Sequence, residues 1–166
     1  MPNPRRITPA NKSISALLAM ALAAFILVPL PTYAEPHDIY SDTADAHAEI
    51  RNALSTAARE HKRVILDFGG NWCGDCKALD YFFHQPENAA LLNQNFVLVD
   101  INIGRYDRNT DLAEKYGVPL KKGVPGLAVL DARGRVLYSQ QNGEFEAMRT
   151  MQSSSVTDFL NKWKPN

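Results

Sequence analysis

The chain has 166 residues, of which 45% are hydrophobic and 22% are charged. This is enough for one globular domain and too little for two domains of ordinary size. Its 18 basic and 18 acidic side chains give a formal net charge of zero, which argues against a surface that binds nucleic acid by neutralising phosphates. The only cysteines, Cys73 and Cys76, are too few for a disulfide-stapled scaffold or a cysteine-rich zinc site. We therefore treat them as a functional pair.

Residues 1–34 have the pattern of an export signal. A basic stretch that ends at Lys12 precedes an apolar run over 16–28, and small residues precede a cleavage point after Ala34. The run is shorter than the ~20 apolar residues that a membrane-spanning helix needs. We therefore expect cleavage, with a retained membrane anchor as the alternative. Such a signal indicates a Gram-negative bacterium and a periplasmic location.

Residues 35–166 alternate helical and strand patterns, which indicates a layered α/β domain. The nearly continuous apolar run over 64–68 suits a buried central strand. In chain order we first predict a helix that Asp42 or Thr43 caps and that runs to about His61, followed by a strand over 64–68. A helix then begins at about Cys76 and stops or kinks near Pro86, more helix follows over 89–92, and a strand covers 96–103. The rest of the chain is predicted to form a short helix over 111–116, an antiparallel hairpin of 127–130 and 135–139, and a last helix that begins with a capping box of Ser155 and Asp158 and ends near Trp163.

The cysteine pair lies where the predicted buried strand turns into a helix. The helix N-terminus carries unpaired N–H groups and a positive dipole end, which favour the thiolate of Cys73 as a nucleophile. Cys76, one turn later and facing inward, is then the resolving thiol. A structural disulfide is one alternative, although closing so small a ring stabilises a fold by only ~2 kcal/mol. A metal half-site is another, but the histidines show no ligand spacing, so we assign no metal ligand.

The segment Asp67-Phe-Gly-Gly-Asn-Trp-Cys-Gly-Asp-Cys-Lys77, followed by Gly123-Val-Pro125, resembles the thioredoxin family over most of residues 45–164. The exported context and the stretch over 80–95 more closely resemble the periplasmic thioredoxin-like domain of the interchange protein DsbD. This resemblance implies a thioredoxin-like fold with a central mixed β-sheet flanked by helices, and a dithiol/disulfide cycle without an added cofactor. It also implies a cis Pro125 that places the Val124 backbone beside Cys73 to pair with an extended substrate segment.

Asp67 lies inside an apolar strand, so we expect a raised pKa and proton exchange with Cys76; a partly exposed Asp67 without a catalytic part is the alternative. We expect Trp72 to shape the rim of the site. The predicted catalytic residues are Cys73, Cys76 and Asp67, and the predicted substrate-binding residues are Trp72, Gly74, Asp75, Val124 and Pro125.

Several positions depart from the thioredoxin pattern. Gly69 and Gly70 replace the usual Trp-Ala, and we expect them to open the surface before the motif. Asp100 takes the place of a lysine near the buried aspartate, which would raise the pKa of Asp67 further. Asp75 would disfavour the Cys73 thiolate because it places a negative charge beside it. A longer loop should place Lys121 and Lys122 beside the substrate groove.

These features predict a periplasmic thiol–disulfide oxidoreductase, a reductase or interchange enzyme that acts on protein disulfides. The predicted partners are disulfide-bearing proteins and a membrane thiol electron donor, and we expect a monomer. The alternatives are a thioredoxin-like metallochaperone or a maturation factor for cytochromes or copper proteins. A third soft ligand near the cysteines would favour metal handling, and Met148 and Met151 are distant from them in sequence.

Overall fold

The structure, a computed structural model, describes residues 38–166. The predicted export signal lies outside the described residues. The helices are α1 (Ala46–Glu60), α2 (Gly74–Phe83), α3 (Pro86–Asn95), α4 (Thr110–Lys115) and α5 (Ser153–Trp163); the strands are β1 (Arg63–Gly69), β2 (Phe96–Asn102), β3 (Gly126–Leu130) and β4 (Val136–Ser139); the short 3-10 helices are η1 (Leu120–Lys122) and η2 (Met148–Thr150).

The four strands form one mixed sheet in the order β2-β1-β3-β4. β1 pairs parallel to β2, whereas β3 is antiparallel to both β1 and β4. Every residue of β1 after Arg63 is buried, as expected for a central strand covered on both faces. The predicted thioredoxin-like α/β fold with a mixed sheet is confirmed.

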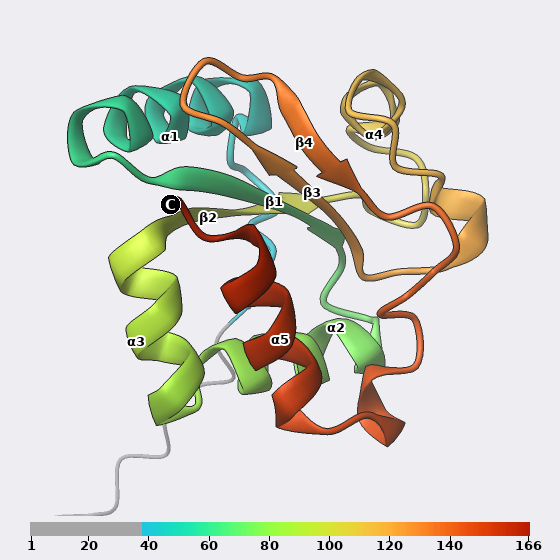
Figure 1. Cartoon of the computed structure of the whole chain (residues 1–166). Helices are drawn as coiled ribbons and strands as arrows, with labels where there is room; N and C mark the ends of the chain where they lie inside the picture. The colour runs from blue at the N-terminus through green and yellow to red at the C-terminus, as the bar shows by residue number, and fades with distance from the viewer. Residues whose placement is uncertain (1–37) are drawn as a thin grey trace, which may run out of the picture. The chain divides into compact units, whose positions relative to one another are not determined.

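Helices cover both faces of this sheet (Figure 1). α1 and α4 pack on one face, where Val64, Leu66 and Phe68 of β1 meet the apolar side of α1. α2, α3 and α5 pack on the other face around Ile65. Because side chains alternate across a strand, β1 contributes side chains to the apolar cores on both faces. The cysteine motif follows directly after the C-terminal end of β1.

Two helix starts differ from the predictions. α1 is capped by Asp45, whose side chain accepts from the Ala48 N–H, so neither Asp42 nor Thr43 is the cap. α5 begins at Ser153 without a side-chain cap, and the predicted capping box of Ser155 and Asp158 is wrong. The helix begins earlier because the Ser153 hydroxyl contacts Asn88 and Glu87 of α3, which a local sequence pattern does not contain.

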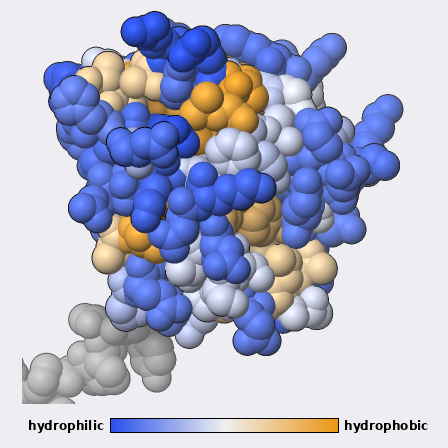
Figure 2. All heavy atoms as spheres, viewed as in Figure 1, coloured by the Kyte–Doolittle hydropathy of each residue, from blue (hydrophilic) through white to orange (hydrophobic). Residues whose placement is uncertain are grey.

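The face seen in Figure 2 is mostly hydrophilic, with hydrophobic side chains gathered over β4. Val136 and Leu137 of this edge strand are exposed. Within residues 38–166, no helix is long and apolar enough to cross a membrane.

Candidate functional site

Cys73 and Cys76 form a disulfide at the N-terminus of α2, with their Cα atoms 5.3 Å apart. Cys73 is the N-cap of this helix, and its Sγ accepts from the Cys76 N–H at 3.0 Å. Cys73 is 5% exposed and Cys76 is fully buried. Cys73 is thus the less enclosed of the two residues, and its sulfur lies at the helix N–H groups that stabilise an anion.

The Val124–Pro125 peptide bond is cis, as the family resemblance implies. It brings the Val124 carbonyl oxygen to 3.6 Å from Cys73 Sγ. The buried side chain of Gln140 holds this loop, because its amide donates to the Pro125 carbonyl at 3.0 Å and its oxygen accepts from the Leu127 N–H at 3.2 Å. Sequence reasoning missed Gln140, since an isolated glutamine after a strand carries no signal for this contact.

Asp67 lies in β1 beneath the motif and is 1% exposed. Burial raises the pKa of this carboxyl well above its usual range, and the neighbouring Asp100 carboxylate raises it further. The Tyr40 hydroxyl donates to Oδ2 at 2.8 Å and acts in the opposite direction. Oδ1 has no hydrogen-bond partner among the described residues. The predicted burial of Asp67 and its raised pKa are confirmed.

Asp100 is the partner of Asp67 in the parallel register of β1 and β2. Burial, together with the nearby Asp80 carboxylate, raises the pKa of Asp100 to about 7. The predicted proximity of the two carboxyl groups is confirmed, and α2 adds Asp80 to the cluster, a contribution that the sequence did not indicate.

Gly69 and Gly70 are buried, so the expectation that they open the surface is wrong. The ring of Tyr40 fills the space at Gly69, where a Cβ atom would overlap the Tyr40 hydroxyl and stand 2.9 Å from Cys76 Sγ. At Gly70 a Cβ atom would stand 2.6 Å from Nε1 of Trp72. Glycine is required here because other side chains close the surface. Nothing in the sequence around Tyr40 indicated that a tyrosine before the first helix reaches the motif.

Trp72 is 39% exposed and lies at the rim of the site, as predicted. Its Nε1 donates to the Gly104 carbonyl, its ring packs 5.6 Å from that of Tyr106, and the Arg105 guanidinium lies 5.2 Å from the ring centre. The loop after β2 therefore fixes the orientation of the indole.

Asp75 binds Arg149, a contact that sequence reasoning missed. Its oxygens accept from Nε at 3.1 Å, from Nη2 at 3.0 Å and from the Arg149 backbone N–H at 3.0 Å. These hydrogen bonds lower the pKa of Asp75. The carboxylate beside Cys73 is thus paired with a cation, so the expectation that it opposes the thiolate as a free charge needs correction. The Arg149 side chain also packs against Gly74.

A groove of about 710 Å³ borders the cis-proline loop. Its lining comes largely from α4, η1 and the segment between them, and it includes Glu114 and Lys121. It also includes Tyr106, which packs on Trp72. Lys121 therefore lines this groove, and Lys122, the next residue in the chain, is exposed.

The sequence left open whether a third soft metal ligand lies near the two cysteines. Met148 is buried, and its side chain packs in the apolar core between the sheet and α2, α3 and α5. No cluster of three or more histidine, cysteine or acidic ligands occurs within residues 38–166. No observation therefore favours the metallochaperone alternative.

Comparisons with known proteins agree with this geometry. A protein disulfide-isomerase from Arthroderma benhamiae is 29% identical over 87% of this chain and 24% of its own length. The thiol:disulfide interchange protein DsbD of Pseudomonas fluorescens is 28% identical over 81% of this chain and 21% of its own length. The chain thus spans about a quarter or less of the curated relatives it matches first.

A solved structure, that of a disulphide isomerase from Xylella fastidiosa, superposes with a TM-score of 0.74 and 37% identity, covering 77% of this chain and 98% of the other. The family model described as thioredoxin-like matches residues 45–132, a span that holds Asp67, both cysteines and the cis-proline. The chain is a member of the thioredoxin-like family.

Proposed function

We propose that the protein is an exported thiol–disulfide oxidoreductase that reduces or exchanges disulfides in proteins. The observation that carries this proposal is the Cys73–Cys76 disulfide at a helix N-terminus, with the cis Val124–Pro125 loop in front of it and the buried Asp67 behind it. The disulfide-isomerase and interchange-protein names of its relatives support the same chemistry.

Reduction begins at Cys73. Its thiolate attacks one sulfur of a substrate disulfide, forms a mixed disulfide and releases the other substrate sulfur as a thiolate. The free N–H groups at the start of α2 stabilise the negative charge before attack. The Arg149–Asp75 ion pair keeps the acidic residue of the motif from adding an unpaired charge beside the nucleophile.

Cys76 completes the reaction. It loses its proton to Asp67 and attacks Cys73 Sγ, and the second substrate sulfur leaves as a thiolate. Two electrons have then passed from the dithiol to the substrate, and the protein holds the Cys73–Cys76 disulfide. A buried carboxyl with a raised pKa is suited to this proton exchange near neutral pH.

Substrate binding takes place at the surface around Cys73. The Val124 backbone can pair with an extended segment, Trp72 and Gly74 flank the sulfur, and the neighbouring groove accepts an apolar side chain of the same segment. Asp75 contributes through its ion pair with Arg149 rather than as a free charge. No added cofactor takes part.

The proposed location is the periplasm, after cleavage of residues 1–34, and the proposed electron donor is a membrane thiol carrier that recharges a monomeric protein. The motif lacks a histidine that would hold Cys73 as a thiolate, which favours a reductant over a strong oxidant. Intact mass of the protein from a periplasmic extract tests the location: a mature chain that begins at Glu35 is expected, and a full-length chain in the membrane fraction would contradict it.

The activity is tested with the purified dithiol form. It should reduce insulin, and a redox titration against glutathione should place its potential nearer to about −270 mV, the thioredoxin value, than to the −120 mV of a strong oxidant. Cys76→Ser should accumulate mixed disulfides with substrates, and Cys73→Ser should accumulate few. Failure to reduce insulin, or equal trapping by the two variants, would contradict the proposal.

A further inference from the structure

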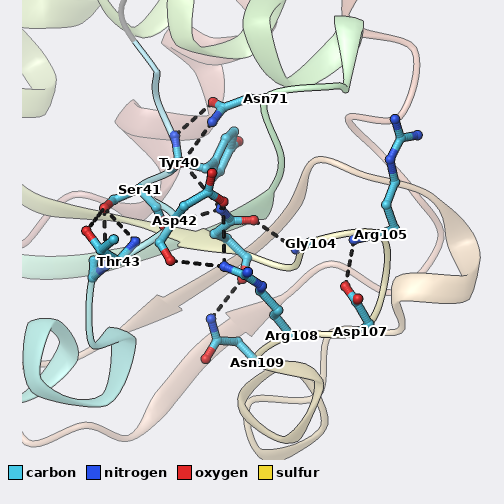
Figure 3. Close-up of polar contacts among 12 residues, drawn as sticks. Tyr40, Ser41, Asp42, Thr43, Asn71, Gly104, Arg105, Asp107, Arg108 and Asn109 are labelled. Carbon is cyan, nitrogen blue, oxygen red and sulfur yellow. Dashed lines mark hydrogen bonds and ion pairs between the residues drawn. The ribbon is translucent and has the colours of Figure 1, made fainter.

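The segment that precedes α1 is clamped to the active-site end of the sheet (Figure 3). The Tyr40 N–H donates to Asn71 Oδ1 at 3.1 Å, and the Asn71 amide donates back to the Tyr40 carbonyl at 2.8 Å. Asn102, the last residue of β2, donates to the same carbonyl and to Asp42. These bonds hold Tyr40 between the loop before Cys73 and the end of β2.

The clamp places the Tyr40 hydroxyl in the buried interior of the site. Tyr40 is fully buried, and its hydroxyl donates to Asp67 Oδ2 at 2.8 Å. Its oxygen and Cys76 Sγ both lie against Gly69, so the hydroxyl stands on the same side of Asp67 as the resolving sulfur. Burial and the Asp67 carboxylate raise the pKa of Tyr40 well above its usual range, so this group stays protonated and acts as a donor.

We propose that Tyr40 is a positioning residue for Asp67: its hydroxyl binds Oδ2 and stabilises the carboxylate form, and it leaves Oδ1 as the oxygen that takes the Cys76 proton. Oδ1 is buried and lacks a partner in residues 38–166. The other titratable groups that face Asp67 are Asp100 of β2 and Asp80 of α2, which both oppose its ionisation. Tyr40 is the neighbour that favours it. This inference rests on the proposed function.

Resolution of the mixed disulfide consists of a single proton transfer followed by thiol–disulfide exchange. In the mixed disulfide, the Cys76 thiol gives its proton to Oδ1 of the Asp67 carboxylate, and the Cys76 thiolate attacks Cys73 Sγ. The Cys73–Cys76 bond forms and the bond to the substrate sulfur breaks. Tyr40 keeps its own proton throughout, so its contribution is to set the pH at which Asp67 is available as a base.

Tyr40→Phe tests this role because it keeps the ring that fills the space above Gly69 and removes only the hydroxyl. The reduced protein is mixed with a chromogenic aryl disulfide in single turnover. Attack by Cys73 releases the first aryl thiolate, and attack by Cys76 releases the second. Loss of a hydrogen bond to a charged group should move the pH midpoint of the second release up by about one unit, which slows it about tenfold below the wild-type midpoint. At higher pH the rates should converge.

Tyr116→Phe is the matched control, because Tyr116 is buried in the same core and no hydrogen bond to Asp67 involves it. It should leave the midpoint unchanged. In an Asp67→Asn background, Tyr40→Phe should have no further effect on the second release. Thermal melting of each variant reports any effect on the fold separately.

The outcomes distinguish a failure of the proposed oxidoreductase function from a failure of the proposed role of Tyr40. If the wild-type protein releases no second thiolate, the proposed function fails. If it does, and Asp67→Asn slows that release while Tyr40→Phe leaves the midpoint in place, Tyr40 only packs against Gly69 and the present inference is overturned.

Discussion

Asp67 is a buried carboxylic acid whose surroundings disfavour its ionised form. It is fully enclosed, its partner across the sheet is Asp100, and no lysine or arginine forms an ion pair with either carboxylate in the described part of the chain. Burying a charged or polar group without full compensation costs stability. The proposed proton exchange with Cys76 would give a carboxylic acid at this position a chemical use.

Replacing Asp67 with asparagine should therefore stabilise the fold and slow the enzyme. The free energy of unfolding should rise by ~1–3 kcal/mol, because an ionisable group no longer has to be buried. Resolution of mixed disulfides should slow, since Cys76 loses its proton acceptor. Urea unfolding and single-turnover release measure the two effects. A variant that is no more stable, or that resolves at the wild-type rate, would show that Asp67 has no such part.

We expect the ion pair with Arg149 to decide how strongly Asp75 affects the Cys73 thiolate. Arg149→Gln leaves the Asp75 carboxylate unpaired at the start of α2, so the Cys73 thiolate should form less readily. The pH midpoint of Cys73 alkylation should rise modestly, and the rise should shrink in high salt because the arginine is exposed.

Two further variants distinguish the effect of charge from the effect of side-chain packing at the Asp75–Arg149 ion pair. Arg149→Lys retains the charge and should recover part of the wild-type midpoint, and Asp75→Asn should lower the midpoint below that of the wild type. A midpoint that Arg149→Gln leaves in place would mean that the ion pair only packs against Gly74.

At the scale of elements, local patterns predicted the helices and strands and failed at their ends. The run over 64–68 and the hairpin over 127–139 depend on period and turn residues, which are local. The starts of α1 and α5 depend on which of several polar side chains binds a backbone N–H or a neighbouring helix. Ser153 shows this, because its contacts with Asn88 and Glu87 join residues far apart in sequence.

The loop between η1 and β3 depends on an element that follows it. Gln140, just after β4, bonds the Pro125 carbonyl and the Leu127 N–H. Gln140→Leu would leave both backbone groups buried without partners, at a cost of ~1–3 kcal/mol. It should also raise the KM for insulin, because the Val124 backbone is no longer held beside Cys73.

The neighbouring Gln141 provides a control for that variant. It is exposed and donates to carbonyls away from the cis-proline, so Gln141→Leu should leave the KM for insulin near the wild-type value. A small aryl disulfide, which needs no backbone pairing, should react equally with all three proteins. An unchanged KM for insulin in Gln140→Leu would separate this side chain from substrate binding.

At the scale of the whole molecule, the sequence contained the reactive motif but not its surroundings. Asp67, Trp72 and both cysteines lie within ten residues, so their association could be predicted. Tyr40, Gln140 and Arg149 come from segments before and after the motif and meet it only through the fold. The same limit explains the error at Gly69 and Gly70, because the side chain that covers Gly69 lies 29 positions earlier.

The carboxyl pair also affects the stability of the whole protein. Asp100 titrates near pH 7 in the fold, and the pKa of Asp67 is raised in the same direction from an ordinary value of 3.8. Between these values the folded protein keeps protons that the unfolded chain has released, so the free energy of unfolding must fall as the pH rises. The extra stability is complete below pH 3.8 and is lost as the pH passes through about 7.

Urea unfolding of the oxidised protein at a series of pH values tests this. Between pH ~5 and ~7.5 the wild-type protein should lose ~1–3 kcal/mol of stability. Asp100→Asn should reduce the loss, and combining it with Asp67→Asn should nearly remove it, because amides do not titrate. Asp158→Asn, which changes an exposed residue of α5, should keep the wild-type slope. If the double variant loses as much stability over this range as the wild-type protein, the protons are held elsewhere and the two carboxyls are not the groups that make folding depend on pH.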